Sequence, residues 1–243
     1  ATFLLILKVL IVLSILIIRF KYNMLDNNKI KKVLLISSLI CIILEIYKQI
    51  NFSFNYDNIH TWWSYQWYAF PFQFCSTPMY IALIAALTKN SKIERACYTF
   101  LATYGVIAGI SVMLYPSTVF VDTIGINIQT MIHHSMMVFI GIFLIINNKM
   151  QYNLKSLLNG TTVFVICVFI ALIINISTYY LNINEGLQMF FISPFHLSSL
   201  PIFNIIYSKV NYIIFLIIYI LAFTFGAYLI LLISKLLKKE IKN

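Results

Sequence analysis

The chain has 243 residues, of which 61% are hydrophobic and only 10% are charged. A soluble domain carries about 25% charged residues, so this composition excludes a soluble enzyme, a disordered chain and a disulfide scaffold, and it predicts an integral membrane protein. The net charge of +10 does not indicate a nucleic-acid partner, because the basic residues stand at the ends of apolar runs and form no groove-sized cluster.

Apolar runs long enough to cross a bilayer follow one another along the chain. A membrane helix needs about 20 mainly apolar residues, and in lipid every backbone polar group must be bonded within the segment, so such continuous runs are helices. We therefore expect an all-α, polytopic transmembrane bundle of about seven spans that forms a single domain over residues 1–243. The spans lie near residues 2–19, 33–51, 71–88, 96–115, 128–146, 157–178 and 211–233.

The basic residues alternate between the two sides of this layout. The connections between spans 1 and 2, 3 and 4, and 5 and 6, together with the C-terminal tail, hold most of the Lys and Arg residues. The other side holds only Lys48 and Lys209. Because Lys and Arg are enriched on the cytoplasmic side of membrane proteins, we predict a multi-pass protein of the cell membrane with its N-terminus outside and its C-terminus inside.

Two segments between spans have unusual sequences. Residues 52–70 are rich in Trp, Tyr and Phe, which is typical of the aromatic belt at a membrane surface, here the outer one. Residues 187–208 are apolar, but Pro194, His196 and Pro201 interrupt them. We expect this second segment to be interfacial or re-entrant, which requires that protein covers its backbone.

In this orientation the polar side chains of the spans gather in the outer half of the bundle. Cys75 stands at the start of span 3, His133 and His134 lie in the first turns of span 5, and Glu45 lies in the outer half of span 2. Polar groups at membrane depth are costly and usually face the bundle interior or a water-filled cavity. Their position predicts a polar cavity near the outer leaflet.

Cys75 is the first candidate for chemistry within this layer. Either Pro71 begins a helix that Pro78 kinks one turn later, or Thr77 is the N-cap and Pro78 the first helical residue. In both cases Cys75 lies beside a helix N-terminus, which favours a nucleophilic thiolate; an inert buried thiol is the alternative. The flanking polar residues that would support substrate binding or an oxyanion are Gln73, Ser76 and Thr77.

A thiol nucleophile needs a base, and His133 and His134 are the candidates. Adjacent helical residues diverge by about 100°, so both imidazoles cannot face inward equally. Gln129 shares a face with His133, and Thr130 shares one with His134. A pair of outer-interface histidines, one solvated and one hydrogen-bonded, is the alternative. Two adjacent histidines do not have the spacing of a zinc site, so we expect no metal.

Glu45 and His196 each leave two roles open. Glu45 either pairs with Lys48 one turn away or orients a catalytic imidazole as a carboxylate does in a triad. His196 either covers the cavity from outside or is an interfacial residue beside two prolines.

Two of these motifs resemble the TMEM164/YwaF family of integral membrane proteins. The first is Pro-Phe-Gln-Phe-Cys-Ser-Thr-Pro-Met-Tyr around Cys75, and the second is the Gln-then-His segment that ends in His134. Vertebrate members of that family are regarded as lipid acyltransferases, so the resemblance implies that Cys75 accepts the acyl group and that His134 is its base. Many bacterial members carry His two residues before the Cys, where this chain has Gln73.

The sequence thus supports two hypotheses. In the first, the protein is a membrane-lipid acyltransferase or hydrolase with catalytic Cys75 and His134, with membrane lipids as substrate and without a cofactor, a nucleic acid or a soluble partner. In the second, it is a non-enzymatic small-molecule binding or transport protein whose ligand contacts the same polar layer. The oligomeric state has no sequence signature.

Overall fold

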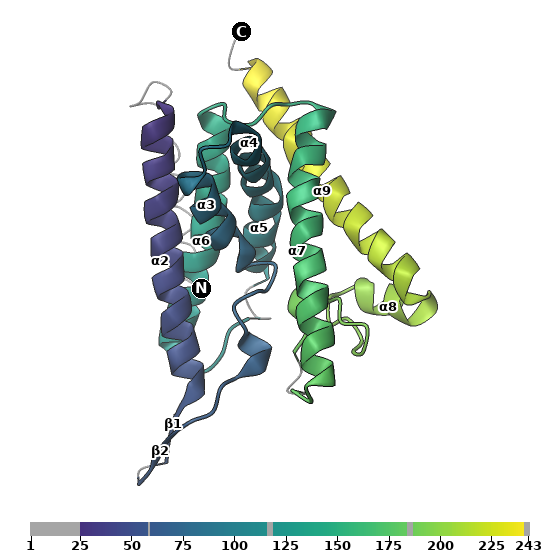
Figure 1. The fold of residues 1–243 in the computed structure, drawn as a ribbon. Coiled ribbons are helices and arrows are strands. Elements are labelled where there is room, and N and C mark those ends of the chain that lie inside the picture. The colour runs from purple at the N-terminus through teal and green to yellow at the C-terminus, as the bar shows by residue number, and fades with distance from the viewer. Residues whose placement is uncertain (1–24, 58, 116–118, 184–186, 241–243) are drawn as a thin grey trace.

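The computed structural model describes residues 25–57, 59–115, 119–183 and 187–240, and helices dominate it (Figure 1). A small two-stranded sheet, β1–β2, is the exception among these residues. The α-helices are α2 (Asn27–Ser53), α3 (Thr77–Leu87), α4 (Ser91–Phe100), α5 (Val106–Leu114), α6 (Ile124–Ile146), α7 (Leu154–Tyr180), α8 (Phe203–Lys209) and α9 (Tyr212–Glu240). The remaining elements are β1 (Phe54–Tyr56), β2 (Thr61–Trp63), η1 (Trp67–Ala69), η2 (Leu101–Gly105) and η4 (Met189–Phe191).

Of the six expected spans that fall in the described residues, five correspond to helical segments long and apolar enough to cross a membrane. They are Asn27–Ser53, Ser91–Leu114, Ile124–Ile146, Leu154–Tyr180 and Tyr212–Leu236. The span expected at 2–19 lies outside the described residues.

The expectation of a full span at 71–88 was wrong. Only the 11 residues of α3 are helical there, and at 1.5 Å per residue they reach about 16 Å, roughly half of the hydrocarbon thickness. Residues 70–76 form bends and turns instead. Pro71 and Pro78 explain this, because each lacks a backbone N–H and disfavours helix in the residue before it.

The segment Ser91–Leu114 is continuous but not uniform. Five residues in its middle, Leu101–Gly105, form a π-helical turn between α4 and α5. Such turns are rare and are often found near functional sites. The segment packs closely on α6, because a Cβ at Gly141 would lie 2.8 Å from the Leu101 carbonyl oxygen. Glycine is needed there for the two backbones to approach.

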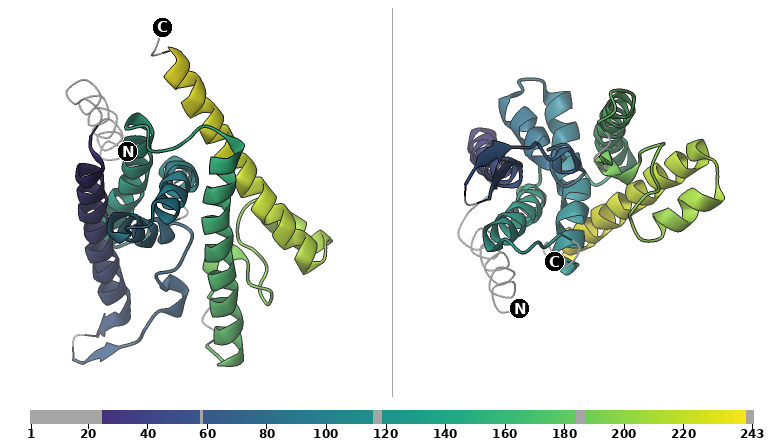
Figure 2. Two further views of the ribbon diagram at one scale, coloured as in Figure 1. Left: turned by 45° about the horizontal axis from the view of Figure 1, so that its top comes forward. Right: turned by 90° about the horizontal axis from the view of Figure 1, so that it is seen from below.

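The helices form a bundle in which neighbours along the chain are often neighbours in space. Helix α2 packs against α3 and α6, α5 packs along α6, and α4 packs along α7. Helix α9 is inclined to α7 and reaches η2 in the centre of the molecule, as the two further views show (Figure 2). The predicted site residues other than His196 stand on α2, on α6 and in or just before α3, and these elements therefore lie together.

The segment expected to be interfacial or re-entrant is irregular and largely buried up to Ser198. Leu187, Met189, Phe190 and Ile192 are buried, and only the short α8 at its end has no buried residue. Phe190 and Phe191 have φ of 57° and 58°, a conformation that is uncommon for bulky residues.

Three side chains from two helices bond the backbone of this buried segment. Asn175 of α7 donates to the Met189 carbonyl oxygen at 3.0 Å and accepts from the Met189 N–H at 2.8 Å. From α9, the Tyr219 hydroxyl donates to the carbonyl oxygen of Phe190 at 2.9 Å, and the Tyr212 hydroxyl donates to that of Ile192 at 2.6 Å. Protein groups thus replace the water that irregular backbone needs at membrane depth.

The aromatic segment after α2 folds as an antiparallel hairpin that projects past the end of that helix (Figure 1). Phe54 pairs with Trp63, and both side chains are exposed, as is Trp62. The sequence analysis expected an aromatic belt and missed the strands. Exposed Trp and Phe side chains at the end of a spanning helix are what such a belt requires.

Candidate functional site

Cys75 lies in a tight turn that leads into α3. The carbonyl oxygen of Gln73 accepts from the backbone N–H groups of Ser76 at 2.9 Å and Thr77 at 3.1 Å. The Cys75 side chain is half-buried, whereas Cys41, Cys97 and Cys167 are buried. Among the four cysteines, Cys75 is therefore the least buried.

The helix after this turn begins close to the second of the two expected arrangements. Ser76 is the N-cap of α3 and Thr77 its first residue, so the cap lies one residue earlier than expected. The Thr77 hydroxyl donates to the Phe74 carbonyl oxygen at 2.9 Å. Pro78 cannot donate to that oxygen, since it has no N–H, and the Thr77 side chain takes its place.

Aromatic packing fixes the residue beside Cys75. The buried ring of Phe74 lies 5.5 Å from Phe164 of α7, 5.5 Å from Phe190 of the irregular segment and 5.0 Å from Phe223 of α9, measured between ring centroids. Rings at these separations attract one another beyond their area burial. Three distant parts of the chain therefore converge at the turn that carries the thiol.

Gln73 ties the same turn to the irregular segment. Its side-chain nitrogen donates to the Gln188 carbonyl oxygen at 3.1 Å, and its side-chain oxygen accepts from the Phe190 N–H at 3.1 Å. A glutamine amide can donate and accept at once. In this chain Gln73 thus has a positioning role that accounts for both ends of its amide.

His133 reaches the turn from α6. Its Nε2 lies 3.2 Å from the carbonyl oxygen of Cys75. A carbonyl oxygen only accepts, so Nε2 carries the hydrogen and Nδ1 keeps a lone pair. Nδ1 is buried and has no hydrogen-bond partner among the residues that the structure describes.

His134 is fixed by its own helix. Its Nδ1 lies 2.6 Å from the carbonyl oxygen of Thr130, so Nδ1 carries the hydrogen and Nε2 keeps the lone pair. This Nε2 is buried and has no hydrogen-bond partner in the described part of the chain. The ring centroids of His133 and His134 are 5.7 Å apart. Both histidines are buried, at 3% and 5% exposure, which does not fit the alternative in which one of them is solvated.

Gly109 of α5 sets the position of this part of α6. A Cβ on Gly109 would lie 2.8 Å from the His134 carbonyl oxygen and 2.7 Å from Val138. Sequence reasoning missed this residue, because a glycine in an apolar run carries no sign of what approaches it. The contact holds the backbone of the imidazole-bearing turn against a neighbouring span.

The ion pair between Glu45 and Lys48 is confirmed, with Lys48 Nζ 2.6 Å from Glu45 Oε1. The same oxygen accepts from the Gln49 amide at 2.8 Å. Glu45 is 4% exposed and makes no hydrogen bond to either histidine among the described contacts. The group that orients His134 is the Thr130 carbonyl, and a carboxylate does not take that role here.

Lys48 carries a positive charge that acts on the side chains of the candidate site. Its ammonium group interacts electrostatically with the thiol of Cys75 and with the imidazoles of His133 and His134. The sequence analysis considered Lys48 only as the partner of Glu45. Helix α2, which carries Lys48, packs on α3 and α6, and this packing is not visible in the sequence.

The remaining predicted residues are distributed unevenly. Gln129 is buried and its side-chain oxygen accepts from the Thr130 hydroxyl at 3.3 Å. His196 is half-buried and makes no hydrogen bond or ion pair with a described residue, so nothing ties it to the cluster. No group of three or more His, Cys, Asp or Glu residues in the described ranges is arranged to hold a metal ion.

The expected oxyanion donors need correction. The backbone N–H groups of Ser76 and Thr77 already bond Gln73, the Thr77 hydroxyl already bonds Phe74, and Pro78 has no N–H. Of the side chains expected to stabilise an oxyanion, the Ser76 hydroxyl is the candidate that remains.

The geometry can now be set beside known proteins. The sequence profile of the TMEM164 family matches residues 1–219. The chain belongs to the TMEM164 family. Searches of curated proteins and of solved structures return no significant match. The match spans both the Cys75 turn and the His133–His134 pair, so the residues that carried the resemblance lie within the part of this TMEM164-family protein that the profile covers.

Proposed function

We propose that this TMEM164-family membrane protein transfers or hydrolyses acyl groups of membrane lipids, with Cys75 as the nucleophile. The observation that carries the proposal is that the turn with half-buried Cys75 is bonded to a helix more than 50 residues away in sequence: His133 Nε2 lies 3.2 Å from the Cys75 carbonyl oxygen, and the buried His134 is the next residue. A substrate that diffuses in the bilayer needs no soluble binding domain, which agrees with a chain made mostly of apolar helices.

The two histidines have different tautomers, and we assign them different roles. His134 is the proposed base, because its Nε2 lone pair is unpartnered among the described residues while Nδ1–H is fixed by Thr130. His133 holds the backbone of Cys75 through Nε2–H. The Lys48 charge favours a thiolate and then an oxyanion, which are both negative, and the paired Glu45 carboxylate offsets part of that effect.

The reaction follows from these roles. His134 Nε2 takes the thiol proton, and the sulfur attacks the ester carbonyl carbon, so that a C–S bond forms and the ester C–O bond breaks. The imidazolium returns the proton to the leaving alkoxide. A lysolipid hydroxyl or a water molecule then loses its proton to the imidazole and attacks the thioester, which releases the thiol.

The test is covalent labelling with a thioester-forming lipid probe in nanodiscs. We expect the wild-type protein to carry the acyl group on Cys75, found by peptide mass spectrometry, and the Cys75→Ala variant to carry none. Cys41→Ala is the matched control, since that thiol is buried in α2, and it should label like the wild type.

A second outcome would favour the other hypothesis. If Cys75→Ala binds a lipid or small molecule as tightly as the wild type, and no acyl group forms on the wild-type thiol, the enzyme proposal fails. The unpartnered nitrogens of His133 and His134 would then be ligand contacts of a binding or transport protein.

A further inference from the structure

A basic hollow lies at the end of the bundle opposite the Cys75 turn. It has a volume of about 480 Å³, within the range of about 300–1,000 Å³ that is typical of small-molecule sites. Its lining has no carboxylate and no aromatic side chain. The residues that line it are Lys92, Arg95, Thr99, Lys149, Gln151, Lys155, Ser156 and Asn159.

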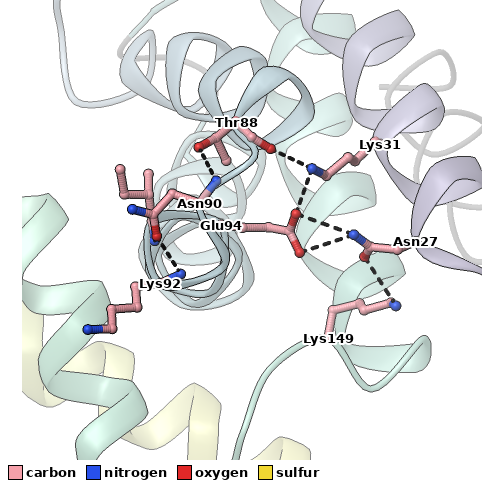
Figure 3. A network of polar contacts seen from close by, with 8 residues as sticks. Asn27, Lys31, Thr88, Asn90, Lys92, Glu94 and Lys149 are labelled. Carbon is pink, nitrogen blue, oxygen red and sulfur yellow. Dashed lines mark hydrogen bonds and ion pairs between the residues drawn. The ribbon is translucent and has the colours of Figure 1, made fainter.

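The nearest acidic residue on the same helix does not neutralise this hollow. Glu94 points toward α2, where its carboxylate lies 2.7 Å from Lys31 Nζ and accepts from the Asn27 amide at 3.2 Å, while Lys92 extends the other way (Figure 3). Helix α4 thus separates a paired acidic face from an unpaired basic one.

Three of the four cations in the hollow are free to bind an anion. Lys92, Arg95 and Lys155 have no side-chain partner among the residues that the structure describes, and all three are exposed. The fourth, Lys149, lies 3.4 Å from the Asn27 side-chain oxygen, a neutral acceptor that leaves its charge uncompensated.

Two helices begin at the rim of the hollow. Helix α4 starts at Ser91 and α7 at Leu154, and Lys92 and Lys155 lie in their first turns. A helix N-terminus carries partial positive charge that adds to the cations. Deeper in, the Thr99 hydroxyl donates to the Arg95 carbonyl oxygen at 3.0 Å and accepts from the Ser156 hydroxyl at 2.8 Å, so the base of the hollow is polar and uncharged.

We propose that this hollow binds a phosphate group. Four cations around a hollow without a carboxylate, and two helix N-termini at its rim, suit a compact anion with several acceptor oxygens, and Lys and Arg pair with phosphate through charge-assisted hydrogen bonds. The site is distinct from the proposed acyl-transfer site, since His134 and the C-terminal end of α6 at Ile146 are about 18 Å apart along that helix.

The phosphate has two possible sources with the same chemistry. Basic recesses between membrane helices bind the headgroups of anionic lipids, which arrive from the bilayer. A soluble phosphate or pyrophosphate would arrive from water. The exposed position of Lys92 and Lys155 at the end of the spanning helices is open to both.

The experiment measures binding to the full chain by microscale thermophoresis, with inorganic pyrophosphate in one arm and short-chain phosphatidic acid in the other. Phosphatidylcholine of the same chain length is the neutral reference. The test variant is Arg95→Gln with Lys155→Gln. The matched control is Lys32→Gln with Lys89→Gln, which removes two exposed charges from the same end of the bundle outside the hollow.

We expect the test variant to weaken binding of the phosphate ligand about 30-fold, from roughly 1 kcal/mol for each cation, and the control to change it less than about twofold. Loss confined to phosphatidic acid assigns the hollow to a lipid headgroup, and loss confined to pyrophosphate assigns it to a soluble anion. The proposal is overturned if neither ligand binds the wild type more tightly than phosphatidylcholine, or if test and control weaken binding equally. Circular dichroism of both variants shows that each is folded.

Discussion

The two ends of the bundle are polar in opposite ways. At the end with Cys75, the polar groups of Glu45, His133 and His134 are buried and bond protein atoms at short range. At the other end, Lys92, Arg95 and Lys155 are exposed and have no described partner. Buried polar groups are costly unless they are bonded in one geometry, whereas exposed cations act over several ångströms. The first end is suited to positioned chemistry and the second to the attraction of an anion.

The largest expected effect is on the rate of acyl transfer at the Cys75 end of the bundle. His134→Ala removes the unpartnered Nε2 and should lower the rate of acyl transfer by about 10²–10⁴-fold, the usual contribution of a general base. Lys32→Gln, at the basic end and remote from both sites, should leave the rate unchanged. Single-turnover labelling of Cys75 measures both. Equal rates in His134→Ala and the wild type would exclude His134 as the base.

A second prediction compares one substitution at the two ends of α7. Asn175→Ala removes both hydrogen bonds to Met189 and leaves buried backbone groups unsatisfied, which should cost about 2–3 kcal/mol of unfolding free energy. Asn159→Ala changes an exposed side chain in the hollow and should stay within about 0.5 kcal/mol. Denaturant titration in micelles gives both values. A similar cost at the two positions would mean that Asn175 does not hold the irregular segment.

Ionic strength should change phosphate binding and acyl transfer to different extents, with smaller effects than the substitutions above. The Debye length falls from about 10 Å at 0.1 M to about 3 Å at 1 M, so phosphate binding in the exposed hollow should weaken severalfold as ionic strength rises. The acyl-transfer rate should hardly change, because the Lys48 charge is buried beside Glu45. Kd and labelling rate measured over one salt series compare the two sites. An acyl-transfer rate that falls as steeply as the phosphate affinity would contradict this view of the Cys75 end.

The smallest expected effect is the weakening of the α2 N-cap as the pH falls. Asp26 caps α2, and the bond that its carboxylate accepts from the Lys29 N–H, with the nearby Lys29 charge, lowers the pKa of Asp26 below 3.8. A depressed pKa stabilises the fold above the unfolded value and loses that contribution as pH falls through the folded one. The first turn of α2 should therefore fray only below about pH 3.8. Asp26→Asn, which keeps the cap, should remove the pH dependence in hydrogen exchange of that turn.

Several features of the fold followed from local sequence rules. Continuous apolar runs predicted the spanning helices, and the i to i+3 spacing of Glu45 and Lys48 predicted their ion pair. The prolines in residues 187–208 predicted irregular backbone there. In each case the deciding interaction acts within one or two turns of the chain, so the sequence alone contains it.

Other features depended on where distant segments meet. Hydropathy could not show that α3 is too short to span, since residues 70–76 are apolar yet adopt turns. The contact of His133 with Cys75, and that of Gln73 with Phe190, join residues from different elements.

Composition and spacing therefore determined that this is a helical membrane protein and which side chains are chemically capable. The tertiary structure decided which of these side chains lie together. It placed the Cys75 turn beside the histidines of α6 at one end of the bundle and grouped cations around a hollow at the other. The physical reason is that helix formation is a short-range process, whereas the direction in which a helix presents its side chains is set by packing against segments remote in the chain.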